Sequence, residues 1–414
     1  IREEEIQPMV MNYPYGIAMA HNGNIVNAEQ VKNQLLKDHK RMSLSKNDLE
    51  AMMNTFAEGL SKDKGNLNED VLTTTLESVY SKVKGGYSSV GVIADHGLVA
   101  FKDPNGIRPL CWGRRKLTDE EKKLDPSISH LTYSYAVASE SKSLSFLGYE
   151  DIEELEQSEF IFITHQGEIT KKVLKQRKLS PCMFEWIYFA NADSKIWNKS
   201  VYQLRLKFGE LLGEKLLPFK DEIDIVVPVP DTARPSAITI SEKLNVPYRE
   251  VLIKNRYAQR TFILNTQQAR EKAVQLKMNV IKEEVEGKSI LLVDDSIVRG
   301  TTSKKIIQLL KANGAKKVMI ASTCPPIIKP CFYGIDFPEE NQLIASNKSF
   351  EQIANTIRAD SAFFLEVEEL KKAFDGLNVC MACLNGDYPV DIDQAQEMIN
   401  SRINHENTSL PGIS

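Results

Sequence analysis

One stretch of this chain restricts its fold more than any other, because it joins an apolar strand to a helix through a short polar loop. It runs from Lys288 to Ser303 and reads KSILLVDDSIVRGTTS. A strand that continues into a helix is typical of βαβ units, which build parallel sheets through right-handed crossovers. Such sheets bind ligands at the carboxyl ends of their strands. The stretch therefore predicts an α/β sheet with a ligand site at Asp294 and Asp295.

The rest of the second half keeps this alternation of strands and helices. Apolar runs predict strands at Ile223–Val229, Val246–Leu252 and Val318–Ser322, and apolar periodicity predicts helices at Ala233–Lys243 and Ser303–Asn313. We therefore expect an α/β domain with a parallel sheet over residues 176–395, followed by a polar tail at 396–414.

The first half has a different rhythm, which favours an α+β domain over residues 1–175. Helices are predicted at Ala28–Leu36, Asp48–Leu60 and Asp70–Lys84, and strands at Tyr15–Ala20, Ser89–Ala94, Gly97–Lys102, Tyr133–Ala138 and Phe160–Thr164. The sequence HNGN at 21–24 is typical of a turn. The charged stretch 116–129 contains a proline and predicts a surface insertion.

Composition excludes several classes of partner. The 414 residues carry 52 basic and 56 acidic side chains, and the resulting net charge of −4 gives no basic field for nucleic acid or for an anionic membrane. The apolar runs are far too short to span a bilayer. Six cysteines are too few for a disulfide framework, so we expect a reducing compartment such as the cytoplasm.

The loop after the predicted strand has the chemistry of an anion site. Backbone N–H groups at a helix start, together with the hydroxyls of Thr301 and Thr302, bind phosphate well. Gly300 permits a left-handed backbone or a close approach to a ligand. Two adjacent carboxylates beside a phosphate suit ribose hydroxyls or a phosphate-bound Mg²⁺. The alternative is a buried strand that ends in a polar turn.

The same stretch resembles the signature of type I phosphoribosyltransferases, which bind 5-phosphoribosyl 1-pyrophosphate (PRPP). Further motifs are similar to those of the amidophosphoribosyltransferase family, in family order: Tyr15-Gly16 with HNGN at 21–24, FKDPNGIRP at 101–109, CMFEWIYFA at 182–190, PVPDTA at 228–233, KNRYAQRTFI at 254–263 and REKAV at 270–274. The resemblance covers about residues 5–392. It implies a glutaminase-like half of the Ntn-hydrolase type, followed by a type I phosphoribosyltransferase half.

The resemblance also implies an activity. Ammonia taken from glutamine would be transferred to PRPP, giving 5-phosphoribosylamine, glutamate and pyrophosphate, which is the first step of purine synthesis. Members of the family are homo-oligomers and are inhibited by purine nucleotides. The alternatives are a PRPP-sensing regulator on the same fold and a phosphoribosyltransferase that uses ammonia alone or a nucleobase.

The resemblance assigns the PRPP site to three segments of the second half. Asp294 and Asp295 would hold Mg²⁺ with Thr232 as a third oxygen, and the loop 298–302 would hold the 5-phosphate. The implied substrate-binding residues of the loop are Asp294, Asp295, Ser296, Val298, Arg299, Gly300, Thr301 and Thr302. A basic and aromatic stretch with Lys254, Arg256, Tyr257 and Arg260 would close over the substrate, although a charge run is usually a solvated loop.

In the first half the resemblance implies an oxyanion hole formed by the side chain of Asn22 and the backbone N–H of Gly23. Asp48 would bind the amino group of glutamine, although its place before a helix also fits an N-cap. The nucleophile of the family is an N-terminal cysteine. Because the chain begins at Ile1, we expect that cysteine upstream and interpret the chain as a fragment without its glutaminase nucleophile.

Four cysteines form a further pattern. Cys380 and Cys383 make a CxxC pair, and Cys182 and Cys331 lie upstream. Four thiolates suit either a [4Fe–4S] cluster or tetrahedral zinc, and spacing does not decide between them. Four reduced, buried thiols are the third possibility, and Cys111 fits a core position. The resemblance favours the iron–sulfur type of the family, with the cluster tying the C-terminal segment to the domain junction.

Three residues depart from the family pattern. Asn191 and Ala192 replace a usual Arg-Pro at the domain junction, where they are expected to change the coupling of the two halves. Arg358 stands where glycine is usual, and the sequence predicts no consequence for it.

Overall fold

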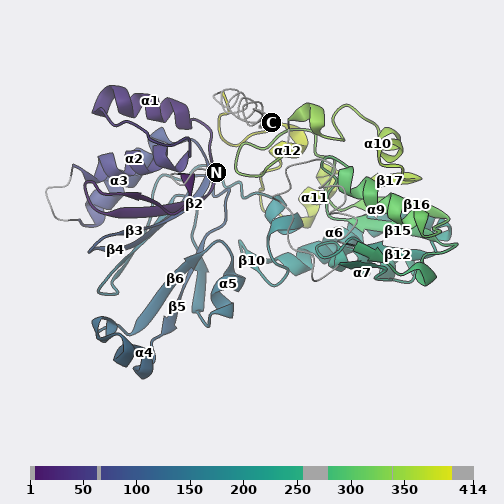
Figure 1. Cartoon of the computed structure of the whole chain (residues 1–414), viewed down its shortest axis with the longest axis horizontal. Coiled ribbons are helices and arrows are strands. Elements are labelled where there is room, and N and C mark those ends of the chain that lie inside the picture. Colours follow the sequence, from purple (N-terminus) through teal and green to yellow (C-terminus); the bar gives the residue numbers. More distant parts are fainter. Residues whose placement is uncertain (1–4, 63–66, 255–277, 338, 394–414) are drawn as a thin grey trace, which may run out of the picture.

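The computed structural model describes residues 5–62, 67–254, 278–337 and 339–393, and it has two lobes (Figure 1). The first lobe is built on a six-stranded antiparallel sheet in the order β1-β2-β3-β4-β8-β9. Its strands are β1 (Met9–Met11), β2 (Ile17–Ile25), β3 (Gly85–Ile93), β4 (Gly97–Lys102), β8 (Glu159–Thr164) and β9 (Ile169–Val173).

Helices α2 (Leu49–Leu60) and α3 (Glu69–Lys82) cover one face of this sheet, and α1 (Ala28–His39) packs on α2 (Figure 1). Helix α2 is buried along its whole length, because it lies between the sheet and α1. Its Met52, Phe56 and Leu60 share one core with Ile17 and Met19 of β2. The predicted helices and the α+β class of this half are confirmed.

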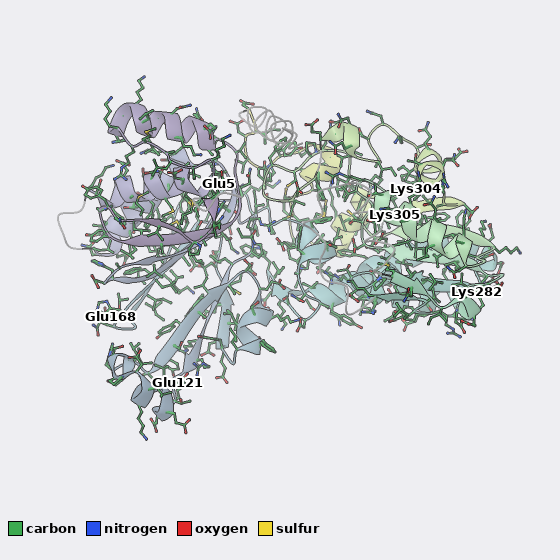
Figure 2. All side chains as sticks on the ribbon, viewed as in Figure 1. Glu5, Glu121, Glu168, Lys282, Lys304 and Lys305 are labelled. Carbon is green, nitrogen blue, oxygen red and sulfur yellow. The ribbon has the colours of Figure 1, made fainter. Side chains whose placement is uncertain are left out.

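A smaller sheet extends from the first lobe, in the order β6-β5-β7. It consists of β5 (Cys111–Lys116), β6 (Tyr133–Ala138) and β7 (Glu150–Glu154), with the short elements α4 (Asp119–Leu124), η2 (Pro126–Ile128) and α5 (Ser141–Phe146). Glu121 lies at its outer tip (Figure 2), where it pairs with Arg115 at 2.6 Å and completes the capping box of α4. Helix α4 buries no residue, so the predicted surface insertion is confirmed.

The second lobe contains a four-stranded parallel sheet in the order β12-β15-β16-β17. Its strands are β12 (Ile225–Pro228), β15 (Ser289–Asp294), β16 (Lys317–Ser322) and β17 (Ser361–Phe364). Helices α6 (Val201–Leu216) and α7 (Arg234–Leu244) pack on one face, and α9 (Thr301–Ala312) and α10 (Phe350–Ile357) on the other (Figure 1). The predicted α/β fold with a parallel sheet is confirmed.

Strand β15 shows why this sheet forms. Every one of its residues is buried, as is typical of a strand covered by helices on both faces. Leu291 and Val293 join the core with α6 and α7, whereas Ile290 and Leu292 join the core with α9 and α10. The alternation of a strand therefore divides one apolar run between two cores.

The chain crosses between the lobes through a π-helical turn, η3 (Glu185–Phe189), and the two-residue strands β10 (Lys195–Ile196) and β11 (Lys199–Ser200). The C-terminal elements α11 (Val367–Ala373) and α12 (Ala382–Asn385) return to this junction, where Cys380 pairs with Cys182 in a parallel bridge. The remaining elements are β13 (Leu252–Lys254), β14 (Met278–Val280), η4 (Leu217–Glu222), η5 (Lys282–Glu284) and η6 (Glu340–Gln342). In the described ranges, no helix has the length and apolar character needed to cross a membrane.

Two predictions about local structure are wrong. The HNGN sequence is not a turn but the end of β2, where Asn22 pairs with Ser88 and Asn24 with Gly86. The Asn24 side chain makes a hydrogen bond within the protein, because its Nδ2 donates to Phe332 O at 2.9 Å. The strand predicted at Val246–Leu252 is reduced to one bridge between Val226 and Tyr248, because Pro247 has no N–H for a ladder.

Candidate functional site

The loop after β15 brings two carboxylates together at the carboxyl edge of the parallel sheet. Asp294 and Asp295 are each only 7% exposed. The backbone N–H of Asp295 donates to Asp294 Oδ1 at 3.0 Å, and Asp295 accepts from Thr232 Oγ1 at 2.5 Å and from Ser296 Oγ at 2.8 Å. The pair and Thr232 therefore meet as the sequence predicted, although the two segments lie more than 60 residues apart.

Burial raises the pKa of both carboxyl groups. For Asp294 the neighbouring charge of Asp295 raises the pKa further, whereas hydrogen bonds from Thr232 and Ser296 oppose the rise for Asp295. The positive charge of Arg205 also opposes the rise for Asp295. Two neighbouring buried carboxylates are costly to keep charged, and a cation bound between them lowers that cost. The arrangement is therefore suited to a hard cation with oxygen ligands.

The same loop ends at the start of α9. Gly300 has φ +73°, and a Cβ atom there would lie 2.4 Å from Ile344 Cδ1 and 2.8 Å from Ile357 Cγ2. Only glycine fits this position, and it turns the chain so that Thr301 and Thr302 open the helix at the exposed edge. The backbone N–H groups of the first turn of α9 are therefore available where a phosphate is expected, and Lys304 and Lys305 follow along the same helix (Figure 2).

The stretch expected to close over the substrate lies mostly outside the described residues, among them Arg256, Tyr257 and Arg260. Lys254, at the end of β13, is described: its Nζ pairs with Asp231 Oδ2 at 3.0 Å. Asp231 follows β12 and adjoins Thr232. Lys254, the first residue of this stretch, is therefore held at the same edge of the parallel sheet as the Asp294–Asp295 pair.

In the first lobe, Asn22 and Gly23 lie side by side in β2. Asn22 Oδ1 accepts from Arg108 Nη2 at 2.9 Å, and Asn22 Nδ2 donates to Ser139 Oγ at 3.3 Å. Gly23 has φ +140°, a backbone conformation that side chains disfavour. Their oxyanion role remains a prediction.

Asp48 lies next to these residues but does not cap α2 with its side chain. Its Oδ2 accepts from the backbone N–H of Ile25 at 2.8 Å and lies 3.2 Å from His21 Nε2. Burial raises the pKa of Asp48, but the bonds from His21 and Ile25 outweigh burial and lower it overall. Asp48 is thus the N-cap residue of α2 by position, as the alternative held, but its carboxylate makes no cap bond and is directed instead to the end of β2 that carries Asn22.

Sequence reasoning missed three residues in this region. His21 Nδ1 lies 3.1 Å from Gln7 Nε2, so His21 links Asp48 to the segment before β1. Arg108 and Glu185 form a buried ion pair at 3.1 Å beside Asn22. All three residues belong to motifs that carry the family resemblance, namely HNGN, FKDPNGIRP and CMFEWIYFA. The sequence does not show, however, that these three motifs lie next to one another in the folded protein.

Comparisons with known proteins agree with this two-part organisation. Two family models match the chain, a glutamine amidotransferase domain at residues 1–122 and a phosphoribosyl transferase domain at 199–330. Proteins named amidophosphoribosyltransferase from Pseudomonas aeruginosa and Escherichia coli are 38% and 39% identical to it, over 94% of this chain and 78% and 77% of theirs. The chain belongs to the amidophosphoribosyltransferase family.

A yeast relative and a solved structure extend the match. The amidophosphoribosyltransferase of Saccharomyces cerevisiae is 40% identical over 88% of this chain and 71% of its own length. The glutamine PRPP amidotransferase from Bacillus subtilis, complexed with ADP and GMP, superimposes with a TM-score of 0.78 at 34% identity, covering 95% of this chain and 82% of that one. The likeness therefore spans both lobes.

The four cysteines predicted to hold a cluster, Cys182, Cys331, Cys380 and Cys383, all belong to or pack against the apolar core at the lobe junction. Cys380 N–H donates to Pro181 O at 2.8 Å, and Cys383 O accepts from the N–H groups of Ile328 and Lys329 at 3.0 Å. Burial, and then the charges of Cys331, Cys182 and Cys380 among others, raise the pKa of Cys383. Within the described residues, no three His, Cys, Asp or Glu side chains are arranged to hold a metal ion.

The loop that carries Cys331 also touches the first lobe. A Cβ atom on Gly334, which has φ +102°, would lie 2.8 Å from Gly23 Cα. Phe332 O accepts the Asn24 side chain in the same place. The two halves typical of the amidophosphoribosyltransferase family are therefore in direct contact at the end of β2.

The structure shows the local contacts or backbone conformation of the three residues that depart from the family pattern. Asn191 donates twice to Glu140 Oε2, from its backbone at 2.8 Å and its side chain at 3.0 Å, and thus links the junction to the small sheet. Ala192 accepts from the backbone N–H of Tyr202 at 3.0 Å. Arg358 adopts φ +65° as the C-cap of α10, a left-handed conformation that glycine suits.

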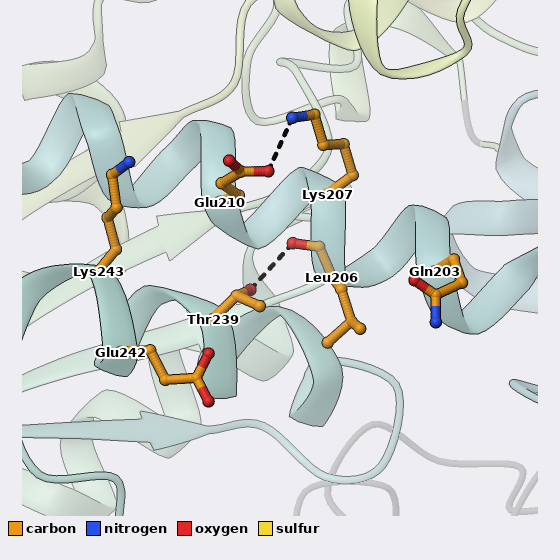
Figure 3. Close-up of a pocket in the computed structure, with 7 residues that line it drawn as sticks. All are labelled: Gln203, Leu206, Lys207, Glu210, Thr239, Glu242 and Lys243. Carbon is orange, nitrogen blue, oxygen red and sulfur yellow. Dashed lines mark hydrogen bonds and ion pairs between the residues drawn. The ribbon is translucent and has the colours of Figure 1, made fainter.

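A polar groove lies between α6 and α7, away from the predicted site residues (Figure 3). Lys207 pairs with Glu210 at 2.7 Å, and Thr239 Oγ1 donates to Leu206 O at 3.0 Å. Neither contact involves a predicted site residue, so we assign the groove no function in the reaction.

Proposed function

We propose that this chain carries out glutamine-dependent amination of PRPP, the activity for which its family is named. Ammonia released from glutamine replaces pyrophosphate at C1 of the ribose, and the products are 5-phosphoribosylamine, glutamate and pyrophosphate. The observation that carries the proposal is the buried Asp294–Asp295 pair with the adjoining glycine-capped helix start, in a chain that also has the glutaminase-like lobe. The product is the first intermediate of purine synthesis.

The phosphoribosyl site stabilises the negative charge of the departing pyrophosphate. Pyrophosphate departs with high negative charge, and Mg²⁺ held by Asp294, Asp295 and Thr232 would supply the neutralising positive charge. The residues fit such an ion, because they are three hard oxygen donors and two of them are neighbouring buried carboxylates. Residues 298–302 hold the 5-phosphate through backbone N–H groups and hydroxyls, and Ser296 and Arg299 complete the loop.

The glutaminase site hydrolyses the side-chain amide of glutamine. Asn22 Nδ2 and the backbone N–H of Gly23 stabilise the oxyanion that forms when the amide is attacked. Asp48 binds the amino group of glutamine, and its lowered pKa keeps it charged for that purpose. The N-terminal cysteine typical of the family supplies the nucleophile.

We further propose that Cys182, Cys331, Cys380 and Cys383 hold a [4Fe–4S] cluster. Support comes from the resemblance to the iron–sulfur type and from the apolar core at the junction, which contains Cys182 and Cys383 and against which Cys331 and Cys380 pack. Burial raises the pKa of Cys182, Cys380 and Cys383, so these thiols would give up their protons to a bound metal ion and would not stand as free thiolates. The cluster would act as a structural tie between the C-terminal segment and the junction.

Three expectations about regulation and setting belong to the same proposal. Purine nucleotides inhibit the enzyme, which is supported by the ADP and GMP bound to the Bacillus subtilis neighbour. The enzyme is a homo-oligomer in the cytoplasm, and its six cysteines, all free thiols, suit a reducing compartment.

Pyrophosphate release tests the proposed function. Full-length protein from the natural gene is given PRPP and Mg²⁺ with either glutamine or ammonium, and pyrophosphate, glutamate and phosphoribosylamine are measured. Stoichiometric release of pyrophosphate and glutamate with glutamine supports it. Pyrophosphate release with ammonium but not with glutamine indicates the ammonia-only alternative. Binding of PRPP without turnover with either nitrogen donor indicates a regulator.

A further inference from the structure

A buried ion pair connects the lobe junction to Asn22. Arg108 and Glu185 are only 5% and 4% exposed, and Arg108 Nη2 lies 3.1 Å from Glu185 Oε1. The same Nη2 atom donates to Asn22 Oδ1 at 2.9 Å. One guanidinium nitrogen therefore joins the junction turn η3 to the proposed oxyanion hole.

This contact fixes which way the amide of Asn22 faces. Arginine has only donors, so the atom of Asn22 directed at Arg108 must be the oxygen. The Nδ2 group is then turned away, where its partner in the structure is Ser139 Oγ at a long 3.3 Å. A flipped amide would set two donors against each other and would offer oxygen to the oxyanion, which is the wrong polarity.

We propose that Arg108, held by Glu185, is a positioning residue for glutamine hydrolysis that locks the Asn22 amide with its N–H group toward the oxyanion. The inference rests on the proposed function, since it gives Asn22 the oxyanion role. It goes further in assigning a task to two residues outside the proposed oxyanion hole.

Arg108 is held rigidly at its backbone. The buried carboxylate of Asp103 accepts from the N–H groups of Asn105 and Ile107 at 2.8 Å and of Arg108 at 3.3 Å. Ser88 Oγ, in the strand next to Asn22, donates to Arg108 O at 2.8 Å. The loop thus delivers the guanidinium to one place, as a positioning role requires.

Glu185 is held from the other lobe. Arg205 of α6 donates to Trp186 O and Ala190 O at 2.8 Å and so fixes the turn that carries Glu185. The Nε and Nη1 groups of Arg108 find no hydrogen-bond partner among the described residues. The Oε1 atom of Glu185 has no hydrogen-bond partner there either, so Glu185 acts on Arg108 through charge, and the guanidinium also lies 6.0 Å from the centre of the Phe189 ring. The side-chain hydrogen bond that Arg108 does make among the described residues is the one to Asn22.

The test compares two ammonia sources in the full-length natural protein. Arg108→Met removes the guanidinium at similar volume, and Arg108→Met with Glu185→Met removes both charges, so that no unpaired charge stays buried. We expect kcat with glutamine to fall by about 10–100-fold with little change in the KM for glutamine, because the lost interaction acts mainly in the transition state. The rate with ammonium should stay within about twofold, and Arg108→Lys should restore part of the glutamine rate.

Lys102→Met is the matched control. Lys102 is fully buried and pairs with Glu154 at 3.0 Å, but no contact joins its side chain to Asn22. It should lower the melting temperature without changing the ratio of glutamine-dependent to ammonia-dependent rates.

The possible outcomes distinguish failure of the positioning role from failure of the proposed function. If Arg108→Met and the double variant fold but keep the wild-type ratio of the two rates, or lose both rates equally, the positioning role is wrong while the proposed function stands. If wild-type protein releases no pyrophosphate with either donor, the proposed function is wrong, and the positioning role is wrong with it.

Discussion

The two candidate sites of this molecule are built in opposite ways. The phosphoribosyl site is almost continuous in sequence, since Asp294 to Thr302 form one loop between β15 and α9. The glutaminase site is assembled from the end of β2, the start of α2, the loop after β4, the turn η3 and the loop around Gly334. A continuous site depends mainly on backbone that its own segment provides, whereas an assembled site depends on packing between distant segments.

The two sites also store unfavourable energy in different forms. In the loop after β15 it is electrostatic, because burial and mutual repulsion raise the pKa of Asp294. At the end of β2 it is steric and conformational, because Gly23 and Gly334 meet with positive φ and no space for side chains. Perturbing charge should therefore break the first site, and perturbing packing the second.

The largest effect is expected from Asp294→Asn combined with Asp295→Asn. Affinity for PRPP in the presence of Mg²⁺ should fall by at least about 100-fold, or ~3 kcal/mol, because both charged metal ligands are lost. The melting temperature without ligand should not fall, since the substitution removes like-charge repulsion between buried groups. Titration calorimetry with and without Mg²⁺ measures the affinity, and unchanged affinity would make the pair structural.

This contrast explains which parts of the molecule were predictable from sequence. The carboxylate pair, Gly300 and the helix start were placed correctly because a strand, a tight turn and a helix are local consequences of KSILLVDDSIVRGTTS. Even Thr232 was assigned to that site, but only through the family resemblance, because no local rule joins it to Asp295.

The assembled site shows where sequence reasoning ends. HNGN was interpreted as a turn because asparagine and glycine favour turns, yet pairing with Gly86 and the bond to Phe332 hold it as a strand. Arg108 and Glu185 were present in quoted motifs without a role, because their meeting depends on how β4, η3 and β2 are arranged in space. Residues with long-range partners need the fold before their function can be stated.

Gly334→Ala should break the assembled site and spare the continuous one. Its Cβ atom would lie 2.8 Å from Gly23 Cα at φ +102°, so we expect a loss of about 2 kcal/mol or more in unfolding free energy. Glutamine-dependent activity should fall more than ammonia-dependent activity, because the displaced backbone is that of Gly23. Gly376→Ala is the control, since it also has positive φ but meets nothing within 4 Å. Equal losses in both variants would show that strain alone, not the contact with Gly23, is responsible.

Cys380→Ser tests the tie between the C-terminal segment and the junction. Anaerobically purified protein should be brown, with about four iron and four sulfide ions per chain, and the variant should lose the colour. Its unfolding free energy should fall by about 1–2 kcal/mol, because a hydroxyl replaces a thiol that is mostly buried in an apolar cluster. Cys111→Ser, at a buried position in the small sheet, is the control and should keep its iron. Iron-free wild-type protein after anaerobic reconstitution would leave the four cysteines as packing residues.

The smallest effect is expected at Arg358, whose side chain is exposed at the end of α10. Its left-handed conformation at the end of α10 costs an ordinary residue about 1–2 kcal/mol, and glycine avoids that cost but loses more entropy on folding. Arg358→Gly should therefore stabilise the protein by about 0.5–1 kcal/mol, whereas Arg358→Ala, which keeps the strain, should not. Denaturant unfolding of the two variants measures the difference, and activity with either ammonia source should be unchanged in both. A destabilised Arg358→Gly protein would mean that the exposed arginine makes a favourable contact that offsets the backbone strain.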